Sequence, residues 1–256
     1  MKHKILKSIF NNKKLSIIGY TKLSHIGEDN LNKLKNFYEK EIVNNQVYFN
    51  SILSEDVDLR INHYNFIKNT LDVYLTHEFE SYKLIVATFF VKAKSDTQTV
   101  GVHIDPTVVN FLDYDDFIVW IPLIDTHIKN TGRIQISPFS HITNKKINLE
   151  NNKYFNYKTQ NNIKVISINL KAGEPVIFFN NMSHGSEINT IYKNRPAISL
   201  KVAIKDAQIA SYYVKDWDKR SVDMYLQDDK LYYMKNRWNE DKIPENGNLY
   251  RNIIAS

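Results

Sequence analysis

The chain has 256 residues, of which 43% are hydrophobic and 12% aromatic, so it is long and apolar enough to fold around a sizeable core rather than stay disordered. It contains no cysteine, which excludes disulfides, thiolate metal sites and cysteine nucleophiles. The formal net charge is +6, but basic and acidic residues are interleaved, which predicts a solvated surface, or a mild preference for anionic ligands, rather than a nucleic-acid-binding patch.

The targeting signals that would place the chain in or across a membrane are missing from the sequence. There is no apolar run of about 18 residues, so we expect no membrane-spanning helix and no membrane partner. Residues 1–10 carry lysines without a long apolar stretch, which does not fit a signal peptide. Together with the absence of cysteine, these features predict a cytoplasmic protein.

We expect a single domain, residues 1–256, with three regions, of which residues 1–81 are the first and are predicted to be helical. Apolar residues recur at helical spacing over Glu28–Val43 and again over Tyr64–Phe79. Residues 27–30, Gly-Glu-Asp-Asn, offer capping groups at the start of the first segment. The pattern therefore predicts two helices ahead of the core.

Residues 82–205 are typical of a β core. Short stretches rich in β-branched and aromatic residues are separated by turn signals such as Asn130-Thr131-Gly132 and Ala172-Gly173. There is no alternation of strands and helices, which argues against a parallel α/β fold and favours a sandwich or barrel. The expected strands are Lys83–Val91, Phe117–Ile124, Ile163–Leu170, Pro175–Phe179 and Ala197–Ile204.

The third region, residues 206–256, combines many aromatic and charged side chains. We interpret it as a C-terminal helical extension that packs on the core. The alternative is a lid or a contact between copies of the chain, because large aromatic residues are enriched at interfaces. Its aromatic residues include Tyr212, Tyr213, Trp217, Tyr225, Tyr232, Tyr233 and Trp238.

The tripeptide His103-Ile104-Asp105 is a candidate half of a metal site. Side chains alternate along a strand, so in a strand His103 and Asp105 would project from the same face. His-x-Asp is a common pattern, and it is not specific by itself. It therefore needs a further ligand elsewhere in the chain.

His184 and Arg195 are the candidates for the rest of the site. His184 follows the expected strand Pro175–Phe179, where a lone histidine is more often structural than a ligand. Arg195 opens the expected strand Ala197–Ile204, where it is either an exposed edge residue or a guanidinium that grips a carboxylate with two parallel hydrogen bonds.

Taken together, these residues predict a site for iron(II). Two histidines and one carboxylate, here His103, Asp105 and His184, occupy one face of a six-coordinate iron and leave three positions open. Two of those positions suit the 2-oxoacid group of 2-oxoglutarate and the third suits O2. Arg195 would then bind the distal carboxylate of 2-oxoglutarate.

At these residues the chain resembles the phytanoyl-CoA dioxygenase-like family of iron(II)/2-oxoglutarate oxygenases. The resemblance covers residues 82–205 well and residues 19–45 loosely. It extends to the segment between the two metal motifs, where Phe139 stands in place of the family's usual glycine. The further segments that carry it are Val119–Asp125, Asn130-Thr131-Gly132, Ser137-Pro138-Phe139-Ser140-His141, Lys171-Ala172-Gly173-Glu174 and Gly19-Tyr20.

The resemblance implies a mainly β fold with flanking helices, whose core is a double-stranded β-helix, a jelly roll of the cupin type. It implies that His103, Asp105 and His184 bind iron and that Arg195 binds 2-oxoglutarate. Further co-substrate contacts are implied for two residues, namely Trp120, which otherwise packs in the core, and Ser186, which otherwise serves the turn. His141 is expected to be a structural, loop-bonding residue.

The activity implied by the resemblance is hydroxylation of an unactivated C–H bond of a small-molecule metabolite, with release of succinate and CO2. Iron halogenases of this fold lack the carboxylate ligand, so Asp105 favours hydroxylation over halogenation, while desaturation, ring formation and epoxidation stay open. The substrate class is not readable, and neither is the oligomeric state. The rival interpretations are a non-catalytic cupin-like metal- or ligand-binding protein, and a jelly-roll isomerase or hydrolase.

Overall fold

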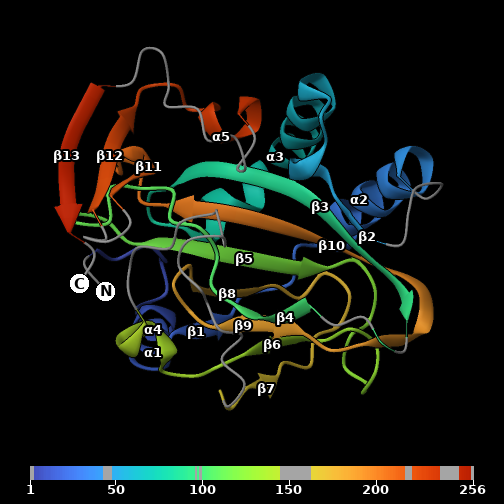
Figure 1. Cartoon of the computed structure of the whole chain (residues 1–256). Helices are drawn as coiled ribbons and strands as arrows, with labels where there is room; N and C mark the ends of the chain where they lie inside the picture. Colours follow the sequence, from blue (N-terminus) through green and yellow to red (C-terminus); the bar gives the residue numbers. More distant parts are fainter. Residues whose placement is uncertain are drawn as a thin grey trace.

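The computed structural model describes residues 3–42, 48–95, 97, 100–144, 163–216, 221–236 and 248–254. Within these residues the protein is mainly β, and every paired strand runs antiparallel to its neighbours. Figure 1 shows a long sheet with helices at one side and a smaller sheet at the other, and a third sheet at the end of the molecule where the termini lie. No helix in the described ranges is long and apolar enough to cross a membrane.

Two sheets make up the core. The larger has six strands in the order β1-β8-β5-β10-β3-β2 and the smaller has four in the order β4-β9-β6-β7. The six are β1 (Tyr20–Lys22), β8 (Val176–Phe179), β5 (Asp116–Pro122), β10 (Asn189–Ala203), β3 (Lys83–Ser95) and β2 (Tyr48–Asn50). The four are β4 (Val100–His103), β9 (His184–Ser186), β6 (Ile134–Ile136) and β7 (Ile166–Ser167).

The six-stranded sheet has one apolar face and one face with polar and aromatic side chains. Cross-strand partners share a face. Ile198 of β10 lies opposite Phe89 and Ile121, and these three buried residues belong to the hydrophobic core. The next residue, Ser199, lies opposite Trp120, and both of these line a cavity on the other face. Successive side chains of these strands therefore point in turn to the apolar face, which the helices cover, and to the face that lines the cavity.

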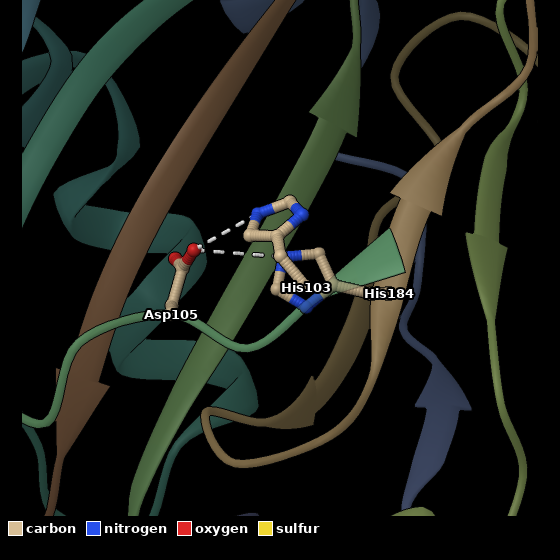
Figure 2. A group of neighbouring side chains, drawn as sticks. All are labelled: His103, Asp105 and His184. Atoms are coloured by element: carbon tan, nitrogen blue, oxygen red, sulfur yellow. Dashed lines mark ion pairs between the residues drawn. The ribbon is translucent and has the colours of Figure 1, made fainter. Parts of the chain in front are cut away.

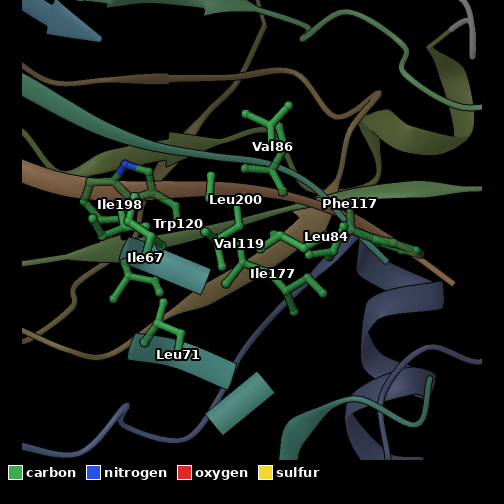
Figure 3. Close-up of a cluster of buried hydrophobic side chains, with 14 of the residues drawn as sticks. Ile67, Leu71, Leu84, Val86, Phe117, Val119, Trp120, Ile177, Ile198 and Leu200 are labelled. Atoms are coloured by element: carbon green, nitrogen blue, oxygen red, sulfur yellow. The ribbon is translucent and has the colours of Figure 1, made fainter. Parts of the chain in front are cut away.

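Helices cover the apolar face. The long helix α3 (Val57–Glu78) packs on β3, and Phe37 of α2 (Glu28–Glu41) stacks on Phe89 at 5.4 Å between ring centroids. Figure 3 shows Ile67 and Leu71 of α3 beside the strand side chains of this cluster. Each such side chain contributes about 1.5–3 kcal/mol by leaving water. The remaining helical segments are α1 (Ile9–Ile18), η1 (Ser51–Leu53), α4 (Ser140–Thr143) and α5 (Tyr232–Lys235).

The mainly β architecture with helices ahead of the core is confirmed, with differences in detail. Helix α3 begins at Val57, earlier than expected, because the side chain of Asp56 caps it by accepting from Leu59 N at 3.0 Å. Helix α1 was not expected, and β1 and β2 join the sheet from the region predicted to be helical. The division of one domain into three regions stays a prediction.

The C-terminal region is not the helical extension that we expected. Strands β11 (Ile209–Asp216), β12 (Ser221–Gln227) and β13 (Asn248–Ile254) form a separate antiparallel sheet, and α5 is short. Tyr212 and Tyr213 are half-buried in β11 and Tyr225 is buried in β12. Tyrosine suits a half-buried strand, and the aromatic content alone did not reveal this. Trp217 and Trp238 lie outside the described residues.

A buried arginine fastens this C-terminal region to α3. Arg60, which is 1% exposed, donates from Nε to Met234 O at 2.7 Å and from Nη2 to Lys235 O at 2.7 Å. It also donates from Nη1 to Ser54 O. Charge-assisted bonds of this kind satisfy the carbonyls at the end of α5.

Candidate metal centre

A cavity of about 170 Å³ lies between the two core sheets, and its lining comes from strands of both. Its walls combine three ionisable ligand-type residues, one arginine, small polar residues and large apolar ones. The lining residues are Asn50, Phe90, Val100, His103, Asp105, Ile118, Trp120, Ile134, Phe178, His184, Gly185, Ser186, Arg195 and Ser199. Both sequence motifs and Arg195 therefore meet in one place.

His103, Asp105 and His184 converge at one side of this cavity. Oδ1 of Asp105 lies 3.3 Å from Nε2 of His103 and 3.7 Å from Nε2 of His184. One ligand atom from each residue lies within 4.8 Å of the others, and Figure 2 shows the three side chains pointing toward one another. This spacing suits a single metal ion held by two nitrogens and one oxygen.

Strand pairing brings the two histidines together, but it does not fix the place of the carboxylate. His103 is the last residue of β4 and His184 the first of β9, and the register places them directly opposite each other. Asp105 lies beyond the end of β4, so our explanation that strand alternation aligns it with His103 was wrong. Its backbone is held instead by Asn180, whose Nδ2 donates to Asp105 O at 3.3 Å and to Pro106 O at 2.9 Å.

Backbone carbonyls fix the orientation of both imidazoles. Nδ1 of His103 lies 2.8 Å from Gly101 O, and Nδ1 of His184 lies 2.9 Å from Met182 O. A carbonyl can only accept, so Nδ1 carries the proton in each ring. In the neutral rings both Nε2 lone pairs then face the Asp105 carboxylate, an arrangement of acceptors that a cation satisfies.

The electrostatics of Asp105 and His184 favour the protonation states that a metal needs, whereas those of His103 favour its protonated form, whose proton a metal has to displace. Burial lowers the pKa of His184 to about 4, and the charge of His103 acts in the same direction, which keeps His184 neutral. Burial raises the pKa of Asp105, but Lys201 and the two histidines outweigh it, and the net shift is far downward. For His103, burial lowers the pKa, while the hydrogen bond to Asp105 more than offsets it and raises the net value. An ionised carboxylate and a neutral imidazole therefore stand ready for a divalent cation.

Arg195 lies in the same cavity and is fully buried. Its guanidinium carbon is 5.2 Å from the ring centroids of both Phe90 and Trp120. Trp120 therefore packs in the core, as one interpretation expected, and also lines the cavity, as the other required. Ser186, buried at the end of β9, lines the cavity too. The structure brings together all six candidate residues, and their binding roles stay predictions.

The sequence analysis missed two buried lysines on the same inner face. Lys92, 2% exposed, lies opposite Arg195 and donates from Nζ to Ser186 Oγ at 3.0 Å and to Glu187 O. Burial and the charge of Arg195 lower the pKa of Lys92 to about 8, against the opposing effect of Glu187. The other, Lys201, is 3% exposed and contacts Asp105. The sequence pattern that could have revealed Lys201 is the alternation of polar residues along β10, because Lys201 shares a face with Ser199 and Arg195.

The segment Ser137–His141 supports the strand that carries His184. Ser137 N donates to Ser183 O at 2.9 Å, and Ser183 N donates to Ser140 Oγ at 3.0 Å. Phe139, at the position of the family's glycine, has φ 66°, a left-handed conformation that glycine adopts without strain. His141 has the structural role that we expected, because its Nε2 bonds to Ser16 O at 3.2 Å.

Comparisons with known proteins show the fold. No family model matches the chain, and no curated protein matches its sequence. Solved structures do match, among them HygX from Streptomyces hygroscopicus with nickel and 2-oxoglutarate bound, at 8% identity and a TM-score of 0.54, covering 78% of this chain and 88% of that one. The non-heme alpha-ketoglutarate-dependent epimerase SnoN of nogalamycin biosynthesis matches at 14% identity and a TM-score of 0.53, covering 77% and 83%. The carbocyclase SnoK of the same biosynthesis matches at 17% identity and 0.53, covering 79% and 86%.

These likenesses establish a jelly-roll-like fold shared with non-heme 2-oxoglutarate-dependent enzymes. The resemblance to the phytanoyl-CoA dioxygenase-like family in particular stays a resemblance of motifs. At identities of 8%, 14% and 17% the likeness is one of fold, and function resides in the residues of the site.

Proposed function

We propose that the chain is a non-haem iron(II)- and 2-oxoglutarate-dependent oxygenase with a double-stranded β-helix core. The observation that carries the proposal is the convergence of His103, Asp105 and His184 in a cavity that also contains buried Arg195. A metal hydrolase has no need of a fixed cation at the spacing of Arg195. A co-substrate with a second carboxylate does need such a cation.

Each residue of the site has a distinct task in this proposal. His103, Asp105 and His184 would hold iron through two Nε2 atoms and one carboxylate oxygen. When bound, iron and 2-oxoglutarate supply the oxidising chemistry by using O2, with succinate and CO2 as products. Arg195 would bind the distal carboxylate of 2-oxoglutarate through its two parallel N–H groups.

The surroundings of Arg195 suit a dicarboxylate. Its charge is reinforced by the ammonium of Lys92, which reaches the cavity through Ser186. The rings of Phe90 and Trp120 enclose the guanidinium and keep water from it, and a charge-assisted bond is stronger where water is excluded. Ser186 would add a hydrogen bond to the same carboxylate.

The reaction that we propose is hydroxylation of an unactivated C–H bond in a small-molecule metabolite. Asp105 would fill the coordination position that iron halogenases of this fold leave to chloride. Neighbours in fold include an epimerase, a carbocyclase and a HygX structure with hygromycin B bound, so small molecules are the substrate class that we favour. The absence of cysteine is compatible with a cytoplasmic setting.

Anaerobic binding of iron(II) and then 2-oxoglutarate tests the proposal. A weak visible charge-transfer band should form in the wild type and disappear in His184→Ala. Asp125 and His127 form a matched His/Asp pair at the surface, with 3.8 Å between ring nitrogen and carboxylate, so His127→Ala is the control and should keep the band. No band in folded, iron-loaded protein would contradict the co-substrate. A band without succinate release in air, across a panel of metabolites, would favour the non-catalytic binding protein.

A further inference from the structure

The two oxygens of the Asp105 carboxylate face different partners. Oδ1 points to the histidines, at 3.3 and 3.7 Å, whereas Oδ2 lies 3.5 Å from Nζ of Lys201. Lys201 belongs to β10 of the six-stranded sheet and is 3% exposed. A buried ammonium thus stands behind the carboxylate, on the side away from the two imidazoles.

The position of this ammonium is fixed by two short hydrogen bonds. Nζ of Lys201 donates to Pro106 O and to Asn180 Oδ1, each at 2.7 Å. Asn180, 1% exposed, in turn donates to Pro106 O and Asp105 O. An ammonium has three N–H donors, so Lys201 can hold both oxygens and still attract the carboxylate.

Lys201 and Asn180 hold Asp105 in place, which strand pairing does not. Because Asp105 lies past the end of β4, no ladder of strand pairing fixes its side chain. Lys201 and Asn180 come from β10 and from the end of β8, neighbours of β5 in the larger sheet. They fix both the backbone of residues 105 and 106 and one carboxylate oxygen to that sheet.

We infer that Lys201 is a positioning residue that holds Oδ2 of Asp105, so that the carboxylate binds the metal through Oδ1 alone. The inference rests on the proposed metal site. Its consequence is the number of open positions. A carboxylate that binds through one oxygen leaves three of six positions for co-substrate and O2, whereas one that binds through both leaves two.

Asp116 offers a competing explanation for the buried lysine, and a cycle of variants separates the two. Asp116 is also buried, and burial raises its pKa to about 6 while the charge of Lys201 opposes that rise. If Lys201 serves Asp105, Lys201→Met should lower the Tm of metal-free protein by roughly 6–20 °C, since one partner of a buried pair is lost. The fall should shrink strongly in an Asp105→Asn background and persist in an Asp116→Asn background. The reverse pattern would assign Lys201 to Asp116 and overturn the inference.

Infrared difference spectra with and without nickel(II), recorded on protein with isotope-labelled aspartate, show whether an aspartate carboxylate binds the metal through one oxygen or through both. The gap between the asymmetric and symmetric carboxylate stretches is wide for one-oxygen ligation and narrow for two-oxygen ligation. We expect a wide gap in the wild type and in Lys83→Met, a half-buried lysine that donates to Ala207 O away from the site, and a narrow gap in Lys201→Met. Should Lys201→Met not fold, Asn180→Ala, which removes one anchor of the ammonium, should narrow the gap in the same direction.

The outcomes separate this inference from the proposed function. A wild type that shows no nickel-dependent carboxylate band lacks the metal site, and both proposals fail. A wild type with a wide gap and a Lys201→Met or Asn180→Ala protein with the same wide gap would keep the metal site and overturn the role of Lys201 alone. A larger nickel-induced rise in Tm for Lys201→Met than for the wild type would support the role, because the metal then replaces the missing cation beside Asp105.

Discussion

Replacing Arg195 by lysine tests whether the site needs only a positive charge or needs the two parallel hydrogen bonds of a guanidinium to a carboxylate. Arg195 is fully buried, with Phe90 and Trp120 each at 5.2 Å, so a lysine there keeps the charge but loses the planar fork. The lost charge-assisted bond amounts to about 1.5–3 kcal/mol. That range corresponds to a fall in 2-oxoglutarate affinity of about 10- to 150-fold.

Anaerobic titration of 2-oxoglutarate into iron-loaded protein measures this loss, and iron affinity is measured in parallel. We expect iron binding to be unchanged, because Arg195 is not a ligand of the metal. Arg133→Lys is the matched control, since Arg133 also makes a two-bond contact, to Glu187 at 2.8 and 2.7 Å, but outside the cavity lining. Unchanged 2-oxoglutarate affinity in Arg195→Lys, or an equal loss of iron, would refute the assigned role.

Further predictions concern buried cations and a strained turn. Burial holds the pKa of Lys92 at about 8 in the folded protein, below the 10.5 of an exposed lysine, so the unfolded chain binds more protons between these pH values. The unfolding free energy of the wild type should therefore rise relative to that of Lys92→Met by up to about 3 kcal/mol from pH 8 to 10.5. Denaturant titrations that show no such rise would contradict the burial of its charge. Arg60→Met should lower the free energy of unfolding by about 3–5 kcal/mol, because buried carbonyls at the end of α5 lose their donor. A decrease below about 1 kcal/mol in denaturant titrations would mean that water replaces the guanidinium as the donor. Phe139→Gly should leave the free energy of unfolding nearly unchanged, whereas Phe139→Val should lower it by about 1–2 kcal/mol, because a β-branched residue is strained at φ 66°. Equal effects of the two variants in thermal melts would argue against backbone strain at this position.

The sequence was sufficient to predict the four inner strands of the larger sheet, β8, β5, β10 and β3, because these strands carry strong local signals. The segments Lys83–Val91 and Phe117–Ile124 are rich in β-branched and aromatic residues, and both lie in central strands of the larger sheet. The C-terminal sheet was missed because the pattern of residues 209–216 was outweighed by their aromatic and charged composition. Strand β1 has three residues and pairs with β8, far away in the sequence, so no local pattern could reveal it.

Part of the candidate site was likewise predictable from the sequence and part of it was not. Residue types and spacing were enough to single out His103, Asp105, His184 and Arg195, which the structure brings to one cavity. The neighbours that support them were not predictable from local pattern, because they act across the fold. Lys201 is 96 positions from Asp105 in the sequence, and a lysine in a strand is usually exposed unless it has a buried partner.

A crystal structure of the protein grown anaerobically with nickel(II) and 2-oxoglutarate would test the central claim most directly. We expect one metal ion bonded to Nε2 of His103, Nε2 of His184 and a single oxygen of Asp105, with the distal carboxylate of 2-oxoglutarate on Arg195. Metal bound at other residues, or 2-oxoglutarate that does not reach Arg195, would contradict the account.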